Sequence, residues 1–285
     1  MFDKTYVVTG GNTGIGKAIA LALAQKQAHV VIVSRDPHKG AQAMADIRIA
    51  AHHKTVDFVV GDLSAVASTH RLAGELLERF PNIAVLINNA GVWMSKREIN
   101  PDGLEVSFMV NHLAPFILSS RLLPCLKANQ PARIVNVNAG LYTMGALDLD
   151  KTPYGQDFGR LKTYANTKLC NLLFTRELAN RLEGSGVTAN AVHPGVIRTN
   201  LGDSSGLVGA LLRLVRRSFA APEAGARAPV WLATSPDLEG VNGQYFNLQE
   251  PAEVAENARD AELGRRLWSL SAALAGLEES SPGNH

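Results

Sequence analysis

Cysteine is scarce in this sequence of 285 residues: Cys125 and Cys170 are the only two. Each lies inside an apolar, helix-like stretch, which indicates buried, reduced thiols and excludes a disulfide framework or a cysteine-based zinc site. Metal-ligand spacing is missing too, because His52, His53 and His193 have no Asp or Glu at the intervals that a metal site uses. The sequence therefore predicts no metal centre.

An excess of charge of one sign is also missing. The formal net charge is +2, with 19% charged and 46% hydrophobic residues. This balance provides no basic field for binding nucleic acid and no acidic excess of the kind that favours disorder. The first apolar run begins at Tyr6, which leaves no room before it for a signal peptide or an apolar anchor of about 20 residues. We expect a cytoplasmic protein without stable membrane insertion.

Short apolar runs rich in β-branched residues alternate with longer amphipathic stretches. The runs predict seven strands, at residues 5–8, 29–33, 55–60, 84–87, 133–137, 187–192 and 244–246. The amphipathic stretches predict helices at 14–26, 37–51, 65–80, 102–128, 161–184, 206–219, 222–234 and 259–275. This alternation is typical of an α/β fold with a doubly wound, seven-stranded, mainly parallel Rossmann-type sheet. Because no linker divides the chain, we expect a single domain over residues 1–277 and a solvated tail at 278–285.

A glycine-rich turn follows the first predicted strand and opens the first helix. Glycines in such a turn let the backbone approach a pyrophosphate, whose charge meets free N–H groups at the start of the helix. In isolation, a tight strand-to-helix turn without any ligand would give the same pattern. The residues that we expect to bind a dinucleotide here are Gly10, Asn12, Thr13, Gly14, Ile15 and Gly16.

The spacing Gly-x3-Gly-x-Gly resembles the short-chain dehydrogenase/reductase family, and other motifs of that family follow in order. They are Asp62-Leu63 after the third strand, Asn88–Gly91 after the fourth, Asn111, the pair Tyr164 and Lys168, and residues 193–199 after the sixth. The residues of four further segments most resemble the retinol-dehydrogenase-like branch of the family: 102–105, 110–113, 131–137 and 186–188. The resemblance covers roughly residues 5–247. It implies a Rossmann-type fold, a nicotinamide cofactor and hydride transfer.

The resemblance also implies which further residues contact the cofactor. Members that prefer NAD usually carry an acid where Ser34 stands, whereas a small Ser34 beside a cationic Arg35 better accommodates a 2′-phosphate. We therefore predict NADP(H), with a solvated surface charge as the alternative role for Arg35. Thr199 resembles the hydroxyl that holds the nicotinamide carboxamide in the family, and a simple helix N-cap is its alternative role. The full set beyond the glycine turn is Ser34, Arg35, Asp62, Leu63, Asn89, Ala90, Gly91, Tyr164, Lys168, Pro194, Gly195, Val196, Ile197 and Thr199.

Tyr164 and Lys168 are the predicted catalytic pair. They are four residues apart in a predicted helix, so both side chains project from one face. A nearby ammonium favours phenolate, so we expect the pKa of Tyr164 to lie below its ordinary value near ~10. In the family the lysine also holds the nicotinamide ribose, and Asn111 maintains a water that links the lysine to solvent. The alternative for Asn111 is a side chain bonded to nearby backbone.

One hydroxyl of the family pattern is absent. The fifth strand normally ends in Asn-Val-Ser-Ser, and the second serine polarises the substrate oxygen, but this chain has Asn138 and Ala139 there. Loss of one such donor typically costs on the order of 10²–10³ in rate. Three explanations stay open. Asn138, Tyr142 or Thr143 substitutes for the serine, the chain is a non-redox relative, or Ala139 is an engineered knock-out.

Two segments beyond the carboxyl edge of the sheet, at 141–160 and 201–221, are expected to contact the substrate. The second is amphipathic, which fits a lid over an apolar substrate and equally a helix packed on the core or on a sister subunit. A membrane-surface role is less favoured, because its three arginines are few for stable interfacial binding. The family's use of long helices as dimer faces is compatible with a homo-oligomer.

These patterns lead to two hypotheses. The leading one is an NADP(H)-dependent oxidoreductase that interconverts a carbonyl and a secondary or primary alcohol on a moderately apolar small molecule. Tyr164 would transfer the proton, Lys168 would tune it, and Asn111 would support the relay. The alternative is an NADP(H)-binding relative with lost or altered redox chemistry, acting as a non-redox catalyst or a sensor. Oxidation or reduction of the cofactor separates the two.

Overall fold

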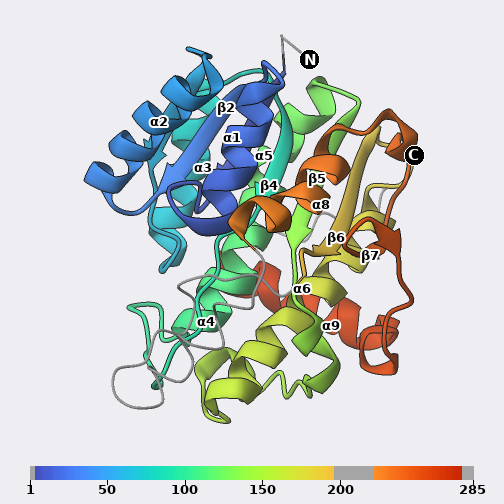
Figure 1. Ribbon diagram of the computed structural model, residues 1–285. Coiled ribbons are helices and arrows are strands. Elements are labelled where there is room, and N and C mark those ends of the chain that lie inside the picture. The colour runs from blue at the N-terminus through green and yellow to red at the C-terminus, as the bar shows by residue number, and fades with distance from the viewer. Residues whose placement is uncertain (1–3, 196–220, 278–285) are drawn as a thin grey trace.

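The computed structural model describes residues 4–195 and 221–277. Within these ranges an eight-stranded sheet runs in the order β3-β2-β1-β4-β5-β6-β7-β8 (Figure 1). Every neighbouring pair is parallel except β7 and β8. The crossover between β1 and β4 confirms the predicted single, doubly wound α/β domain. The strands are β1 (Thr5–Thr9), β2 (His29–Ser34), β3 (Val56–Val60), β4 (Ile83–Asn88), β5 (Ala132–Val137), β6 (Val187–His193), β7 (Tyr245–Asn247) and β8 (Glu250–Pro251).

The described part of the sheet has one strand more than the seven that the sequence predicts. The extra strand, β8, has only two residues and pairs antiparallel with β7. The chain reverses between them through a two-residue turn in which Leu248 has a φ of 57°. A segment this short has none of the alternating apolar positions by which a strand is recognised, so no pattern could indicate it.

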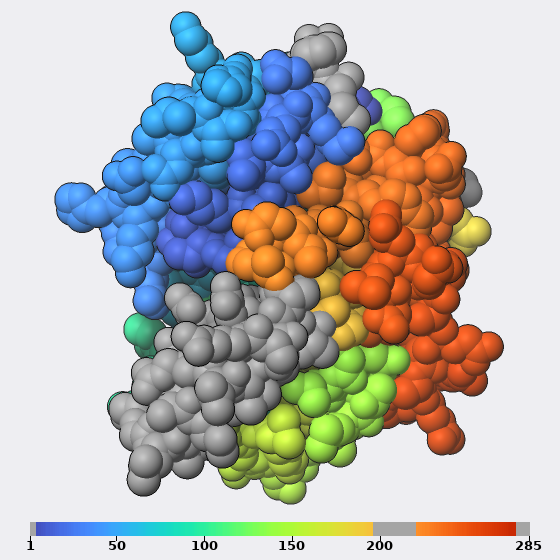
Figure 2. All heavy atoms as spheres, viewed as in Figure 1, coloured from blue at the N-terminus to red at the C-terminus, as the bar shows by residue number. Residues whose placement is uncertain are grey.

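Helices cover both faces of the sheet because the central strands are apolar on both faces. All five residues of β1 and all six of β4 are buried. One face is covered by α1 (Gly14–Gln25), α2 (Pro37–Ala51) and α8 (Pro222–Thr234). The other is covered by α3 (Val66–Arg79), α5 (Ala114–Ala128), α6 (Arg160–Arg181) and α9 (Ala261–Ala275). In the space-filling view of Figure 2, α8 lies directly beside α1.

The remaining helical elements within the described residues are short. They are α4 (Val106–Phe108), the π-helical turn η1 (Met109–Leu113), and the 3-10 turns η2 (Gly140–Met144), η3 (Thr152–Tyr154), η4 (Pro236–Leu238) and η5 (Glu256–Ala258). The helix predicted at 102–128 therefore begins only at Val106. The start is late because Asn100 Oδ1 accepts hydrogen bonds from the amides of Asp102 and Leu104, and Gly103 has a φ of 79°. The helix predicted at 206–219 and the tail at 278–285 lie outside the described residues.

The segment Val106–Ala128 is, within the described ranges, the one helix long and apolar enough to cross a membrane by length and composition. However, 78% of its 18-residue apolar window is buried inside the domain, which identifies the segment as a core helix. Its far side is covered by α9, because Trp268 packs against Phe116 of α5, with 4.8 Å between ring centroids, and against Phe174 of α6. A homo-oligomer built on this face of α5 and α6 would have to displace α9.

Candidate active site

The glycine turn between β1 and α1 forms a cradle that fits a pyrophosphate. Gly10 and Gly14 have φ angles of 65° and 52°, which few residues other than glycine adopt. A Cβ atom on Gly16 would clash with the carbonyl oxygen of Gly10, whereas one on Gly14 would meet nothing within 4 Å. Thr13 is the N-cap of α1 but makes no side-chain cap hydrogen bond, and the first turn of α1 has no acidic residue. The backbone N–H groups at this helix start are thus available to an anion.

Hydrogen bonds link this turn to the end of β4. Thr9 Oγ1 accepts from the backbone amides of Asn89 and Ala90, both at 3.0 Å. Asn89 Nδ2 in turn donates to the carbonyl oxygen of Thr9 at 2.9 Å. These bonds bring two of the predicted cofactor residues next to Gly10, at the edge where the parallel strands end.

The predicted adenosine end of the site lies at the ends of β2 and β3. Ser34 is buried, and its Oγ donates to the carbonyl oxygen of Asp36 at 2.9 Å. Ser34 pairs with Val60 in the sheet, so Asp62 and Leu63 follow on the neighbouring strand. Arg35 is exposed and forms no ion pair or hydrogen bond with any described residue. An exposed guanidinium at this edge can receive a phosphate without first breaking a protein contact.

Tyr164, Lys168 and Asn111 come together at the same edge of the sheet. Lys168 is buried; its Nζ donates to the carbonyl oxygen of Val137 at 3.0 Å and lies 5.7 Å from the centroid of the Tyr164 ring. A Cβ atom on Gly91 would lie 3.4 Å from Asn111 Oδ1 and 3.9 Å from Lys168 Nζ. Gly91 therefore stands between the two polar side chains and leaves room beside the ammonium.

Asn111 lies in the π-helical turn η1, a distortion often found at functional sites. Its Oδ1 accepts from the amide of Val92 at 2.7 Å, and its Nδ2 donates to Val92 O at 2.9 Å and to Thr167 Oγ1 at 3.0 Å. The side chain thus connects the segment after β4 to α6, beside Lys168. The alternative role considered for Asn111 was a side chain bonded to nearby backbone. The two bonds to the Val92 backbone are of this kind, and they reach across the site.

The predicted lowering of the pKa of Tyr164 is wrong for the protein without cofactor. Burial raises the pKa of Tyr164 to about 12 and lowers the pKa of Lys168 to about 8. The cation does not offset the burial of the phenol, because its Nζ donates to Val137 O and not to the tyrosine oxygen. At neutral pH the tyrosine is therefore an uncharged phenol, the form that can donate a proton.

A tryptophan that the sequence analysis missed covers the tyrosine. The rings of Trp93 and Tyr164 are stacked, with 4.6 Å between centroids and 13° between planes. Trp93 Nε1 donates to the carbonyl oxygen of Arg160 at 2.8 Å, which fixes the indole over the start of α6. The only signal in the sequence was an aromatic residue two positions after Gly91.

The side chains proposed to replace the missing serine each form hydrogen bonds within the protein. Asn138 Oδ1 accepts from the amide of Ala139 at 2.7 Å, and Asn138 Nδ2 donates to Lys168 O at 3.2 Å. The Tyr142 hydroxyl accepts from the amide of Ala255 at 3.0 Å, and Thr143 Oγ1 donates to Gly140 O at 3.1 Å. In this arrangement Asn138 holds α6 against the end of β5.

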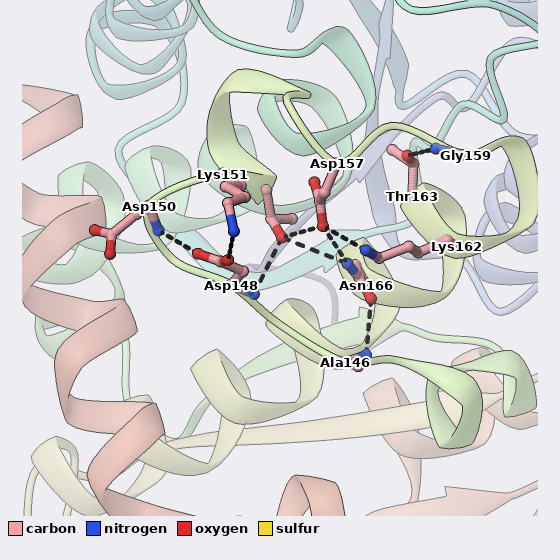
Figure 3. A network of polar contacts seen from close by, with 10 residues as sticks. Ala146, Asp148, Asp150, Lys151, Asp157, Gly159, Lys162, Thr163 and Asn166 are labelled. Carbon is pink, nitrogen blue, oxygen red and sulfur yellow. Dashed lines mark hydrogen bonds and ion pairs between the residues drawn. The ribbon is translucent and has the colours of Figure 1, made fainter.

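The first predicted substrate segment, 141–160, is fixed to α6 by a polar network (Figure 3). Asp157 accepts from Thr152 Oγ1 at 3.1 Å and from Asn166 Nδ2 at 3.4 Å, and pairs with Lys162 Nζ at 3.1 Å. Asn166 Oδ1 accepts from the amide of Ala146 at 2.9 Å. Because Asn166 is two residues from Tyr164, the network fixes the segment relative to the tyrosine.

Pro194 and Gly195 follow β6 as predicted, and Gly195 has a φ of 90°. Val196, Ile197 and Thr199 lie outside the described residues, as does nearly all of the second substrate segment, 201–221. The described residues contain no group of three or more His, Cys, Asp and Glu side chains that could hold a metal ion.

Comparison with known proteins finds dehydrogenases that are similar to this chain over most of its length. The family described as short chain dehydrogenase matches residues 4–206. Human retinol dehydrogenase 14 is 38% identical over 97% of this chain and 88% of its own length, and human dehydrogenase/reductase SDR family member 13 is 40% identical over 98% and 76%. A crystal structure of an uncharacterised protein from Mycobacterium paratuberculosis matches with a TM-score of 0.78, 29% identity and coverage of 96% and 94%. A short chain dehydrogenase from Burkholderia cenocepacia, solved in complex with NADP, has the same fold, with a TM-score of 0.70, 24% identity and coverage of 86% and 96%.

Proposed function

This chain belongs to the short chain dehydrogenase family, a family of oxidoreductases, and on that premise we propose that it is an NADP(H)-dependent carbonyl reductase or alcohol dehydrogenase. Its substrate would be a moderately apolar small molecule that carries a carbonyl or a secondary or primary alcohol. The observation that carries the proposal is the convergence of Tyr164, Lys168 and Asn111 beside the glycine turn. The names of the retinol dehydrogenase relatives favour an apolar alcohol or aldehyde as the substrate class.

The dinucleotide, when bound, supplies hydride chemistry at the nicotinamide ring. Tyr164 donates its proton to the substrate oxygen, since burial keeps the phenol uncharged at neutral pH. Lys168 supplies a positive charge beside that phenol and, with a pKa of about 8, remains mostly protonated at pH 7. Trp93 covers one face of the tyrosine ring and so excludes water from it. Asn111 holds the segment that carries Gly91 and Trp93 in place.

The proposed preference for NADP(H) rests on Arg35 and on the absence of an acid at position 34. The Burkholderia cenocepacia protein has the same fold as this chain and was solved in complex with NADP. This complex supports the proposal that the fold binds a dinucleotide here.

We expect NADPH to bind at least tenfold more tightly than NADH, a difference of ~1.4 kcal/mol. Arg35→Ala should remove most of this difference, because the exposed guanidinium pairs with the 2′-phosphate that only NADPH carries. Calorimetric titration with each cofactor measures the ratio. Arg121→Ala, which changes another exposed arginine on α5, is the control and should leave the ratio as it is. Equal affinities in the unaltered protein would refute the assignment.

A second candidate function follows from Ala139, which has no hydroxyl to polarise a substrate. In that case the protein binds NADP(H) and acts as a non-redox catalyst or a sensor. Loss of NADPH absorbance with a panel of aldehydes and ketones, and its gain from NADP⁺ with alcohols, separates the two functions. Turnover with any member of the panel supports the redox function; tight NADPH binding without turnover supports the second.

A further inference from the structure

The structure leaves the polarising hydrogen bond to the substrate oxygen without an obvious donor. The hydroxyl is missing at Ala139, and the nearby polar groups of Asn138, Tyr142 and Thr143 bond to the protein itself. One polar side chain at this edge has no role in the site so far. It is His193, the last residue of β6.

His193 lies beside the end of β5, where the serine would stand. The last register pair of β5 and β6 joins Val137 to Val192, and the amide of Asn138 donates to Val192 O at 2.8 Å. The next residue of β6, His193, therefore neighbours Asn138 and Ala139. Its own carbonyl accepts from the amide of Leu248 at 2.9 Å, which fixes its backbone.

The imidazole faces α6, the helix that carries the catalytic pair. Alternate residues of a strand share a face, and Ala189 and Ala191 belong to the core that α6 covers, so His193 points to the same side. Burial and then the charge of Lys168 lower the pKa of His193, which also indicates that the two side chains are close. A neutral imidazole carries one N–H donor.

The two ring nitrogens of His193 differ in their surroundings. Nδ1 of His193 is fully buried and has no hydrogen-bond partner, and neither ring nitrogen bonds to a described residue. A buried lone pair without a partner costs less than a buried N–H without one, so the proton belongs on Nε2. A Cβ atom on Gly140, the residue after Ala139, would lie 3.8 Å from Nε2. Nε2 therefore lies within van der Waals reach of the residue that follows Ala139.

We propose that His193 donates, through Nε2, the hydrogen bond to the substrate oxygen that a serine at position 139 would provide. The inference rests on the proposed redox function. In it, Tyr164 transfers the proton while His193 only polarises the carbonyl, so no proton leaves the imidazole. A histidine of β6 thereby compensates for the loss of a hydroxyl at the end of β5, across one strand pair.

A double-mutant cycle tests this compensation. His193→Leu should lower kcat/KM for carbonyl reduction on the order of 10²-fold in the unaltered background, because one preorganised donor is lost. In the Ala139→Ser background the same change should cost less than about threefold, since the serine hydroxyl now supplies the bond. Affinity for NADPH should stay within about twofold throughout. His53→Leu, at the opposite edge of the sheet, is the matched control and should not change turnover.

Each outcome bears on the proposal. An equal loss in both backgrounds would show that His193 only supports the structure, and no loss in the unaltered background would show that it has no part in the chemistry; either overturns the inference. If His193→Leu fails to fold, His193→Gln, which keeps an N–H donor, should retain at least a tenth of the turnover, and complete loss overturns the inference. Absence of hydride transfer in every variant, Ala139→Ser included, would overturn the proposed function and the inference together. Turnover that is insensitive to His193 overturns the inference alone.

Discussion

Tyr164→Phe should lower kcat/KM for carbonyl reduction about 10³-fold and leave the affinity for NADPH within about twofold. The phenol of Tyr164 lies beside Lys168 and under Trp93, and its raised pKa, about 12, keeps the proton on the oxygen at neutral pH. Removing the oxygen removes the proton donor but little of the binding surface. Steady-state kinetics and a fluorescence titration with NADPH measure the two effects separately.

Tyr6→Phe is the matched control, because Tyr6 is a buried tyrosine of β1 whose hydroxyl makes no hydrogen bond to a described residue. It should leave turnover unchanged. If Tyr164→Phe keeps turnover within about threefold of the unaltered protein, the proton travels by another route.

Lys168→Met should reduce turnover at least 10²-fold and at the same time stabilise the fold. A pKa that falls from 10.5 to about 8 corresponds to about 3 kcal/mol of cost for the buried ammonium at neutral pH. Loss of the hydrogen bond to Val137 O offsets about 1 kcal/mol of the gain. We expect a net gain of about 1–2 kcal/mol and a rise in Tm of several degrees.

The stabilisation expected from Lys168→Met depends on pH. Because the pKa of Lys168 is lower in the folded than in the unfolded chain, the unfolded chain binds more protons between about pH 8 and 10.5, and the stability contributed by this residue rises with pH across that window. The advantage of Lys168→Met should therefore be largest below pH 8 and shrink toward pH 10.5. Thermal melts at both ends of the window measure it. Lys162→Met, which replaces a half-exposed lysine of the same helix, should give no gain. A loss of stability with Lys168→Met at neutral pH would contradict the burial argument.

The sequence predicted the parallel part of the fold because the strands are short runs rich in apolar, β-branched residues, nearly continuous in β2 and β4, between glycine or polar turns. It also predicted the position of the glycine turn, because the local backbone requires glycine there. Gly10 and Gly14 have positive φ angles, and a Cβ atom on Gly16 would clash with the carbonyl oxygen of Gly10. The two-residue strand β8 has no such pattern. Residues 102–105 were wrongly predicted to be helical. They form a turn that the Asn100 side chain stabilises, and one such turn does not disturb the helical spacing of the apolar residues around it.

Within the site, the grouping of Tyr164 with Lys168 follows from helical spacing, but their protonation does not. Spacing shows that the two side chains are near each other, whereas burial decides which charge the protein tolerates. Trp93 follows β4 and His193 ends β6, so neither lies on α6 itself. Their positions depend on which strands are neighbours in the sheet, and no pattern within one segment records that.

We propose that this chain transfers hydride between NADPH and a carbonyl. The most direct measurement incubates the unaltered protein with NADPH deuterated at nicotinamide C4, on each face in turn, and a panel of apolar aldehydes and ketones, and follows the label by mass spectrometry. We predict an alcohol product that carries one deuterium on the former carbonyl carbon, from one of the two labelled cofactors only. Tight binding of NADPH with no labelled alcohol from any carbonyl, in the unaltered protein and in Ala139→Ser alike, would contradict the claim.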